Sequence, residues 1–129
     1  MTDFTPQPSL KMKPISAVTW GWRLSCLAAA LYIAWQSLEP GTGIVGSPYT
    51  DKVMHFIAYL TLSGLALLSR FTPRTLRVLS IIFVFGVLME AMQGLMNMGR
   101  TASLADIAAN LVGIMVAWGL WNGAKALRK

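Results

Sequence analysis

Four apolar runs, each about as long as a bilayer core is thick, limit what this chain can fold into. They span residues 18–38, 51–69, 76–96 and 103–121. An apolar helix of about 20 residues crosses the hydrocarbon core of a membrane. Lipid offers no hydrogen-bond partners to the backbone, and a helix pairs its backbone groups within the segment. We therefore predict an all-α fold, a bundle of four transmembrane helices.

The composition agrees with a chain that lies mostly in lipid. Of its 129 residues, 55% are hydrophobic and 12% are charged, whereas soluble domains carry about 25% charged residues. A disordered chain would be far less apolar. Four spans leave room for short loops but not for a second domain. We predict one membrane domain over residues 18–122, a polar tail over 1–17 and a basic tail over 123–129.

The basic residues predict the orientation of the bundle. Most of them fall in three clusters, around the start of the first run, around the junction of the second and third runs, and after the fourth: Lys11, Lys13, Arg23, Arg70, Arg74, Arg77, Lys125, Arg128 and Lys129. Basic residues beside transmembrane helices stay in the cytoplasm, and four spans place all three clusters on one side. We predict a multi-pass protein of the bacterial cytoplasmic (inner) membrane with both termini cytoplasmic. Topology then accounts for the basic residues, and we expect no nucleic-acid partner.

A second set of polar residues is predicted to gather at the extracytoplasmic face. These residues lie where the second and fourth runs begin and where the third run ends, and those three places share a side in a four-span chain. The set comprises Asp51, Lys52, His55, Glu90, Gln93, Arg100, Asp106 and Asn110. We predict that it forms a ligand-binding site.

Glu90 is the deepest acid of the set. An ionised carboxylate in hydrocarbon costs several kcal/mol, so Glu90 should face the bundle interior. Gly86 and Gly94 lie one turn to either side of it and would permit a neighbouring helix to approach closely. Intramembrane acids are functional by default. The alternative is structural, with Arg100 pairing with an acid only to lock the outer loop.

Three kinds of chemistry could use these residues. Glu90 or His55 could be a catalytic general acid or base. Asp51, His55, Glu90 and Asp106 could hold a divalent metal cofactor, since they offer one imidazole and three carboxylates. Plain binding is the third, in which cations such as Lys52 take an anionic group and the acids take amines or hydroxyls.

Each of these residues also has a structural interpretation. Asp51 would be a helix N-cap, and Asp106 the acid of a capping box that begins at Ser103. His55 would form a hydrogen bond between helices. Lys52 would anchor a helix end by snorkelling to the headgroups.

The order and spacing of these residues resemble the VanZ-like family of small bacterial integral membrane proteins. The similar segments are Asp51-Lys52-x-x-His55-Phe56-x-x-Tyr59, Glu90-x-x-Gln93 and Arg100-x-x-Ser103-x-x-Asp106-x-x-x-Asn110-x-x-Gly113. They cover about residues 49–120, and the first run shows no comparable pattern.

The resemblance implies a four-helix membrane protein with an extracytoplasmic polar signature. The family takes its name from a member associated with resistance to the glycopeptide antibiotic teicoplanin, and no reaction is assigned to the family as a whole. We expect a protein that binds or acts on a lipid or cell-wall precursor. The rival hypotheses are a membrane-embedded hydrolase or transferase on lipid-linked substrates, and a purely structural polar cluster. The bilayer is the expected partner, and small-residue faces could also pair two copies.

Overall fold

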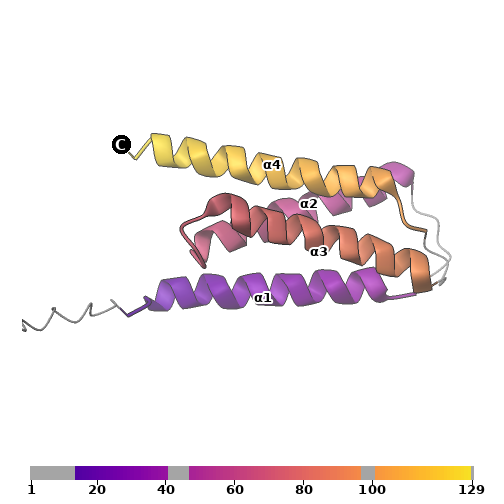
Figure 1. Ribbon diagram of the computed structural model, residues 1–129, viewed down its shortest axis with the longest axis horizontal. Coiled ribbons are helices and arrows are strands. Elements are labelled where there is room, and N and C mark those ends of the chain that lie inside the picture. Colours follow the sequence, from indigo (N-terminus) through magenta and orange to yellow (C-terminus); the bar gives the residue numbers. More distant parts are fainter. Residues whose placement is uncertain (1–13, 41–46, 97–100, 129) are drawn as a thin grey trace, which may run out of the picture.

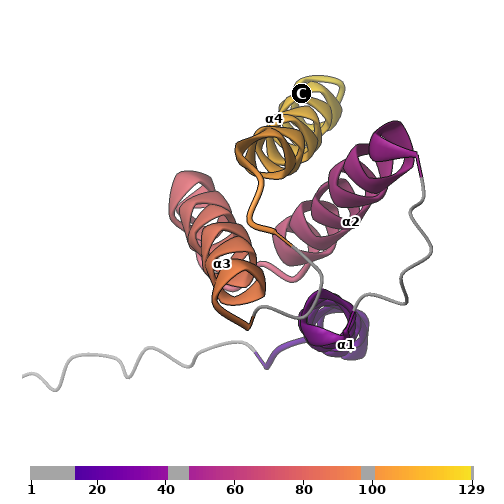
Figure 2. The same ribbon diagram turned by 90° about the vertical axis from the view of Figure 1, so that its right-hand side faces the viewer.

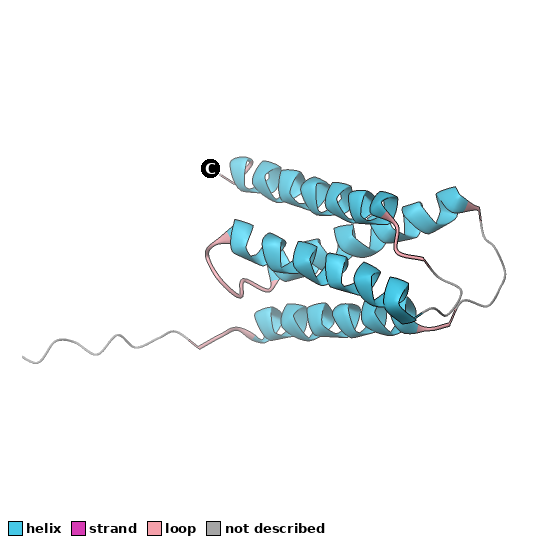
Figure 3. Ribbon diagram, turned by 45° about the vertical axis from the view of Figure 1, so that its right-hand side comes forward, coloured by secondary structure: helices cyan, strands magenta, loops and turns pink. Residues whose placement is uncertain are grey.

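The structure, a computed structural model, describes residues 14–40, 47–96 and 101–128. These residues form helices joined by loops, with no strand among them (Figure 3). The helices are α1 (Ala17–Leu38), α2 (Pro48–Leu68), α3 (Thr75–Met96) and α4 (Leu104–Ala126). Each is long and apolar enough to cross a membrane. The predicted all-α bundle of four membrane-spanning helices is confirmed.

The helices run alternately up and down, so their ends gather at two levels (Figure 1). One level, which we call the cluster end, holds the end of α1, the start of α2, the end of α3 and the start of α4. The opposite level, the termini end, holds the start of α1, the α2–α3 turn and the end of α4. In the view along the bundle, α1 and α4 lie at opposite corners with α2 and α3 between them (Figure 2).

The start of α2 differs from the prediction. The helix begins at Pro48 because Ser47 caps it, with the Ser47 hydroxyl accepting the N–H of Tyr49. A proline in the first turn loses nothing by lacking an N–H, since that group would be unpaired there. Asp51 therefore lies within the first turn of α2. The interpretation of Asp51 as the N-cap was wrong.

The start of α4 follows the predicted cap, whereas its end lies further along the chain. The Ser103 hydroxyl accepts the N–H of Asp106 at 3.3 Å, as in a capping box. The helix continues to Ala126 instead of residue 121, because no proline interrupts it there. Lys125 in the last turn also interacts favourably with the helix dipole. Part of the predicted basic tail is thus helical.

Glycine allows α4 to lie directly on α2. A Cβ atom on Gly113 would lie 2.5 Å from the carbonyl oxygen of Phe56 and 2.9 Å from the amide nitrogen of Leu60. Any larger residue would push the two backbones apart. On α3, a Cβ atom on Gly86 would lie 2.9 Å from the ring of Tyr59. These two glycines bring α2, α3 and α4 close enough for their polar side chains to touch.

Arg23 ties α1 to the end of α2. Its Nε donates a hydrogen bond to the Ser69 carbonyl oxygen at 3.2 Å. Its guanidinium lies 5.4 Å from the ring centre of Trp20 and 5.2 Å from that of Phe71, within the range of cation–π attraction. Arg23 therefore bridges two helices, a role that the sequence did not indicate.

Candidate functional site

The predicted polar set assembles at the cluster end. All of its members in the described ranges lie there, on α2, α3 and α4. Arg100, and with it the predicted pairing of Arg100 with an acid, lies outside the described residues. The arrangement has a buried layer, which three helices share, and an accessible layer, which faces a pocket.

Glu90 lies at the centre of the buried layer. It is 1% exposed, as is Asn110, while Asp106 and Gln93 are 5% and 6% exposed. One carboxylate oxygen of Glu90, Oε2, accepts the backbone N–H of Ser103 at 3.1 Å. This bond joins α3 to the residue that caps α4. The deepest acid of the set thus faces the bundle interior, as the sequence predicts.

His55 connects this buried layer to α2. Its Nε2 lies 3.6 Å from Oε1 of Glu90, and its Nδ1 lies 3.1 Å from Oδ1 of Asn110. In this orientation of the amide, Nδ1 donates to Asn110, and a neutral ring accepts at Nε2. Rotation of the Asn110 amide by half a turn reverses the pattern, so that Nε2 carries the ring proton toward Glu90. The geometry therefore permits a proton to lie on either side of the His55–Glu90 contact.

An ion pair joins α2 to α4 beside this contact. The Lys52 ammonium lies 3.1 Å from Oδ1 of Asp106, and the two side chains are 39% and 7% exposed. Lys52 is therefore more than a snorkelling anchor, because it neutralises a buried carboxylate on another helix. An unpaired carboxylate at that depth would be costly.

A pocket of about 360 Å³ lies beside the cluster, between α1 and α2. Asp51, His55 and Tyr59 share one wall, as their spacing of one helical turn predicts. Gln93 of α3 reaches the same pocket. The opposite wall consists of Tyr32, Ile33, Gln36, Ser37, Glu39 and Pro40. No Lys or Arg of the described segments lines it, and the ionisable groups with acid or imidazole side chains there are Glu39, Asp51 and His55.

The sequence of this chain matches a known protein family. A family model described as VanZ/LLP1 matches residues 9–126. The chain belongs to the VanZ/LLP1 family. Neither the comparison with curated proteins nor that with solved structures gave a match. The family match and the four helices that can span a membrane together make the chain a multi-pass membrane protein of the VanZ type.

The family match also includes α1, which the resemblance over residues 49–120 left out. In this VanZ/LLP1 chain, α1 supplies the pocket wall that sequence reasoning missed. Gln36, a polar residue near the end of an apolar helix, could have indicated it; its Nε2 donates to the Tyr32 hydroxyl at 3.2 Å. The Ser103 N–H that binds Glu90 could not have been found, because every residue except proline carries a backbone donor.

Three predicted metal ligands of the VanZ/LLP1 chain also converge. Asp51, His55 and Asp106 each place one ligand atom within 4.8 Å of the others, and Glu90 is not a member of this group. Imidazole and carboxylate together suit divalent transition metals. However, the Lys52 ammonium already lies on Asp106. A divalent ion would have to displace that cation, so the donor set fits a metal only in part.

Proposed function

We propose that this VanZ/LLP1 protein binds a lipid or cell-envelope ligand in the pocket at the cluster end. The observation that carries the proposal concerns His55, which lines the pocket while its ring nitrogens face the buried Glu90 and Asn110. A cluster that only held helices together would need no member in an accessible pocket. Here the imidazole couples whatever enters the pocket to the buried network.

The groups around the pocket favour a particular class of ligand. Asp51 and Glu39 supply carboxylates, and Tyr32 and Tyr59 supply phenolic hydroxyls. Lys52, which lies next to Asp51 on α2, is paired with Asp106. Carboxylates accept hydrogen bonds from amines and hydroxyls and repel phosphate. The ligand is therefore a molecule with an amine-bearing or hydroxyl-rich headgroup.

The apolar part of the pocket favours an amphiphile. Ile33, Met54 and Ala58 line the same space as the polar groups. An acyl or prenyl chain could lie against them while the headgroup reaches His55. An envelope lipid whose headgroup carries an amine or sugar hydroxyls and no phosphate beside its chain has both parts.

The cluster end is proposed to face the outside of the cytoplasmic membrane. The termini end carries the exposed basic residues Arg70, Arg74, Arg77, Lys125 and Arg128. Basic residues beside membrane spans stay in the cytoplasm. Both termini would then be cytoplasmic, and the pocket would open toward the cell envelope.

Native mass spectrometry of the protein extracted from its own membranes tests the binding proposal. Tyr32→Ala removes a pocket residue that is 56% exposed and outside the buried network. Leu31→Ala is the matched control, because Leu31 is 63% exposed on the same helix and does not line the pocket. The wild type and the control should retain the same amine- or hydroxyl-bearing lipid, and Tyr32→Ala should lose it. Equal retention by all three would contradict the proposal.

A second candidate function is catalysis on a lipid-linked substrate, as a hydrolase or transferase. The 3.6 Å approach of His55 Nε2 to Glu90 Oε1 favours it, because a proton can lie on either group at the edge of a pocket. Its test is turnover of a bacterial lipid extract by purified protein, with and without divalent metal. Turnover that Glu90→Gln abolishes while lipid retention persists would favour the enzyme over the binding protein.

A further inference from the structure

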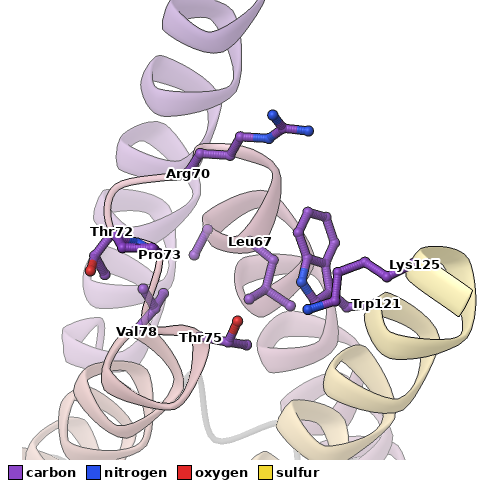
Figure 4. A pocket seen from close by; sticks show the side chains of 9 residues that line it. Leu67, Arg70, Thr72, Pro73, Thr75, Val78, Trp121 and Lys125 are labelled. Carbon is purple, nitrogen blue, oxygen red and sulfur yellow. The ribbon is translucent and has the colours of Figure 1, made fainter. Parts of the chain in front are cut away.

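A second pocket, of about 370 Å³, lies at the termini end of the bundle. It is formed between the α2–α3 turn, the start of α3 and the end of α4. Figure 4 shows the Arg70 side chain extended along the rim of the pocket and Lys125 reaching toward it from α4, with the ring of Trp121 between the two in this view. Two cations from distant parts of the sequence thus line one pocket.

These cations have no acidic partner in the described parts of the chain. The acids there are Glu39, Asp51, Glu90 and Asp106, and all of them lie at the cluster end. Thr72 and Thr75 also line the pocket, and the Thr72 hydroxyl accepts the backbone N–H of Arg74 at 3.3 Å. Guanidinium, ammonium and hydroxyl groups together form the donor set that binds phosphate.

The remaining wall of this pocket is apolar. Ala66, Leu67 and Val78, all buried, line it together with the indole of Trp121. A free phosphate ion would gain nothing from this wall. A lipid would place its phosphate at the rim and the first part of its acyl chain against the wall. The pocket also lies at a bundle end, where lipid headgroups are found.

The backbone at Arg70 gives independent support. Arg70 has a φ of 47°, in the left-handed region that glycine adopts without strain and that most other residues avoid. An arginine at this position costs conformational energy. Arg70 directly follows Ser69, the C-cap of α2, and at this position helices commonly end with a left-handed residue that is usually glycine. The arginine that stands here in place of glycine lines the pocket.

We infer that this termini-end pocket binds the phosphate group of an anionic membrane lipid. Arg70 and Lys125 contact the phosphate, and Leu67 and Val78 contact the acyl chain. The site is separate from the cluster-end pocket in charge and in position. It does not depend on the function proposed for that pocket.

Titration of the purified full chain with short-chain phosphatidylglycerol, followed by native mass spectrometry, tests this inference. The double variant Arg70→Gln with Lys125→Gln removes both pocket cations. The double variant Arg74→Gln with Arg128→Gln removes the same charge from exposed residues that do not line the pocket. We expect the first to bind about tenfold more weakly than wild type. The control should stay within about twofold of wild type.

Three results would overturn the inference. They are an equal loss of affinity in both double variants, equal binding of phosphatidylcholine with the same chains, and competition by inorganic phosphate as strong as that by the lipid. A single variant, Arg70→Gly, guards against misfolding as the explanation. It should keep or raise the melting temperature, because glycine relieves the backbone strain, while it weakens phosphatidylglycerol binding. If Arg70→Gly bound this lipid as the wild type does, Arg70 would not be a ligand.

Discussion

The Nε2 atom of His55 lies 3.6 Å from Oε1 of Glu90, across the interface between α2 and α3. Glu90 is 1% exposed, whereas the imidazole lines a pocket. Because both ring nitrogens of His55 face buried partners, a ligand in the pocket would contact the carbon edge or the face of the ring, and it would act on Glu90 by shifting the imidazole. This relationship links the packing of the bundle to the function proposed for it.

Substitutions at Glu90 should separate its size from its charge. Glu90→Gln keeps an oxygen that can accept the Ser103 N–H, so we expect a loss of about 1–2 kcal/mol in the free energy of unfolding. Glu90→Ala leaves both Ser103 and His55 without this partner, and we expect a loss of about 3–5 kcal/mol. Thermal and denaturant unfolding in detergent measures both. Equal losses would show that the hydrogen bond from Ser103, which Glu90→Gln keeps, contributes nothing to stability.

The contact between α2 and α4 should not tolerate a methyl group. Gly113→Ala would place a Cβ atom 2.5 Å from the Phe56 carbonyl oxygen, so we expect a loss of about 1–3 kcal/mol. Gly119→Ala, on the same helix, meets nothing within 4 Å and should be neutral or stabilise by up to about 1 kcal/mol. Melting temperatures of the two variants give the comparison. If Gly113→Ala melted like Gly119→Ala, the close approach of the backbones would be refuted.

The Lys52–Asp106 ion pair should appear as a coupling energy. A double-mutant cycle with Lys52→Met and Asp106→Asn should give about 1 kcal/mol, because Lys52 is partly exposed and solvent weakens the attraction. Added salt should lower this coupling. Asp106→Asn keeps the backbone N–H of residue 106, which donates to the Ser103 hydroxyl. The cap of α4 is therefore unchanged and serves as an internal control. A coupling of zero at low salt would mean that the two charges act independently.

The proposed orientation can be tested with single cysteines. Tyr49 at the cluster end is 81% exposed, and Leu127 at the termini end is 91% exposed. In a Cys26→Ala background, which removes the natural cysteine, Tyr49→Cys should react with a membrane-impermeant maleimide in intact cells. Leu127→Cys should react only after the cells are opened. The reverse pattern would place the pocket in the cytoplasm.

Much of this architecture could be predicted from the sequence because it depends on periodicity. Apolar runs of bilayer length fix the helices, and an even number of spans brings the polar ends of three helices together. Asp51, His55 and Tyr59 share a wall because residues four apart lie on one helix face. Such regularities need no knowledge of which helix packs on which.

Contacts that depend on the packing could not be predicted. The sequence did not indicate that Lys52, on α2, pairs with Asp106 on α4. The periodicity of one helix does not determine how far it lies from another helix. The pocket wall from α1 was missed for the same reason. The N-cap of α2 was misplaced at Asp51, since Ser47, four residues earlier, has a side chain that caps helices equally well.

Photo-crosslinking in living cells tests the proposed pocket most directly. A photoreactive amino acid in place of Met54 would stand in the cluster-end pocket, and one in place of Val53 would stand on the same helix outside it. We predict that the probe at Met54 captures one amine- or hydroxyl-bearing envelope molecule, and that Tyr32→Ala abolishes the adduct. The probe at Val53 should capture only bulk phospholipid. Identical adducts from both probes would contradict a ligand site at the cluster end.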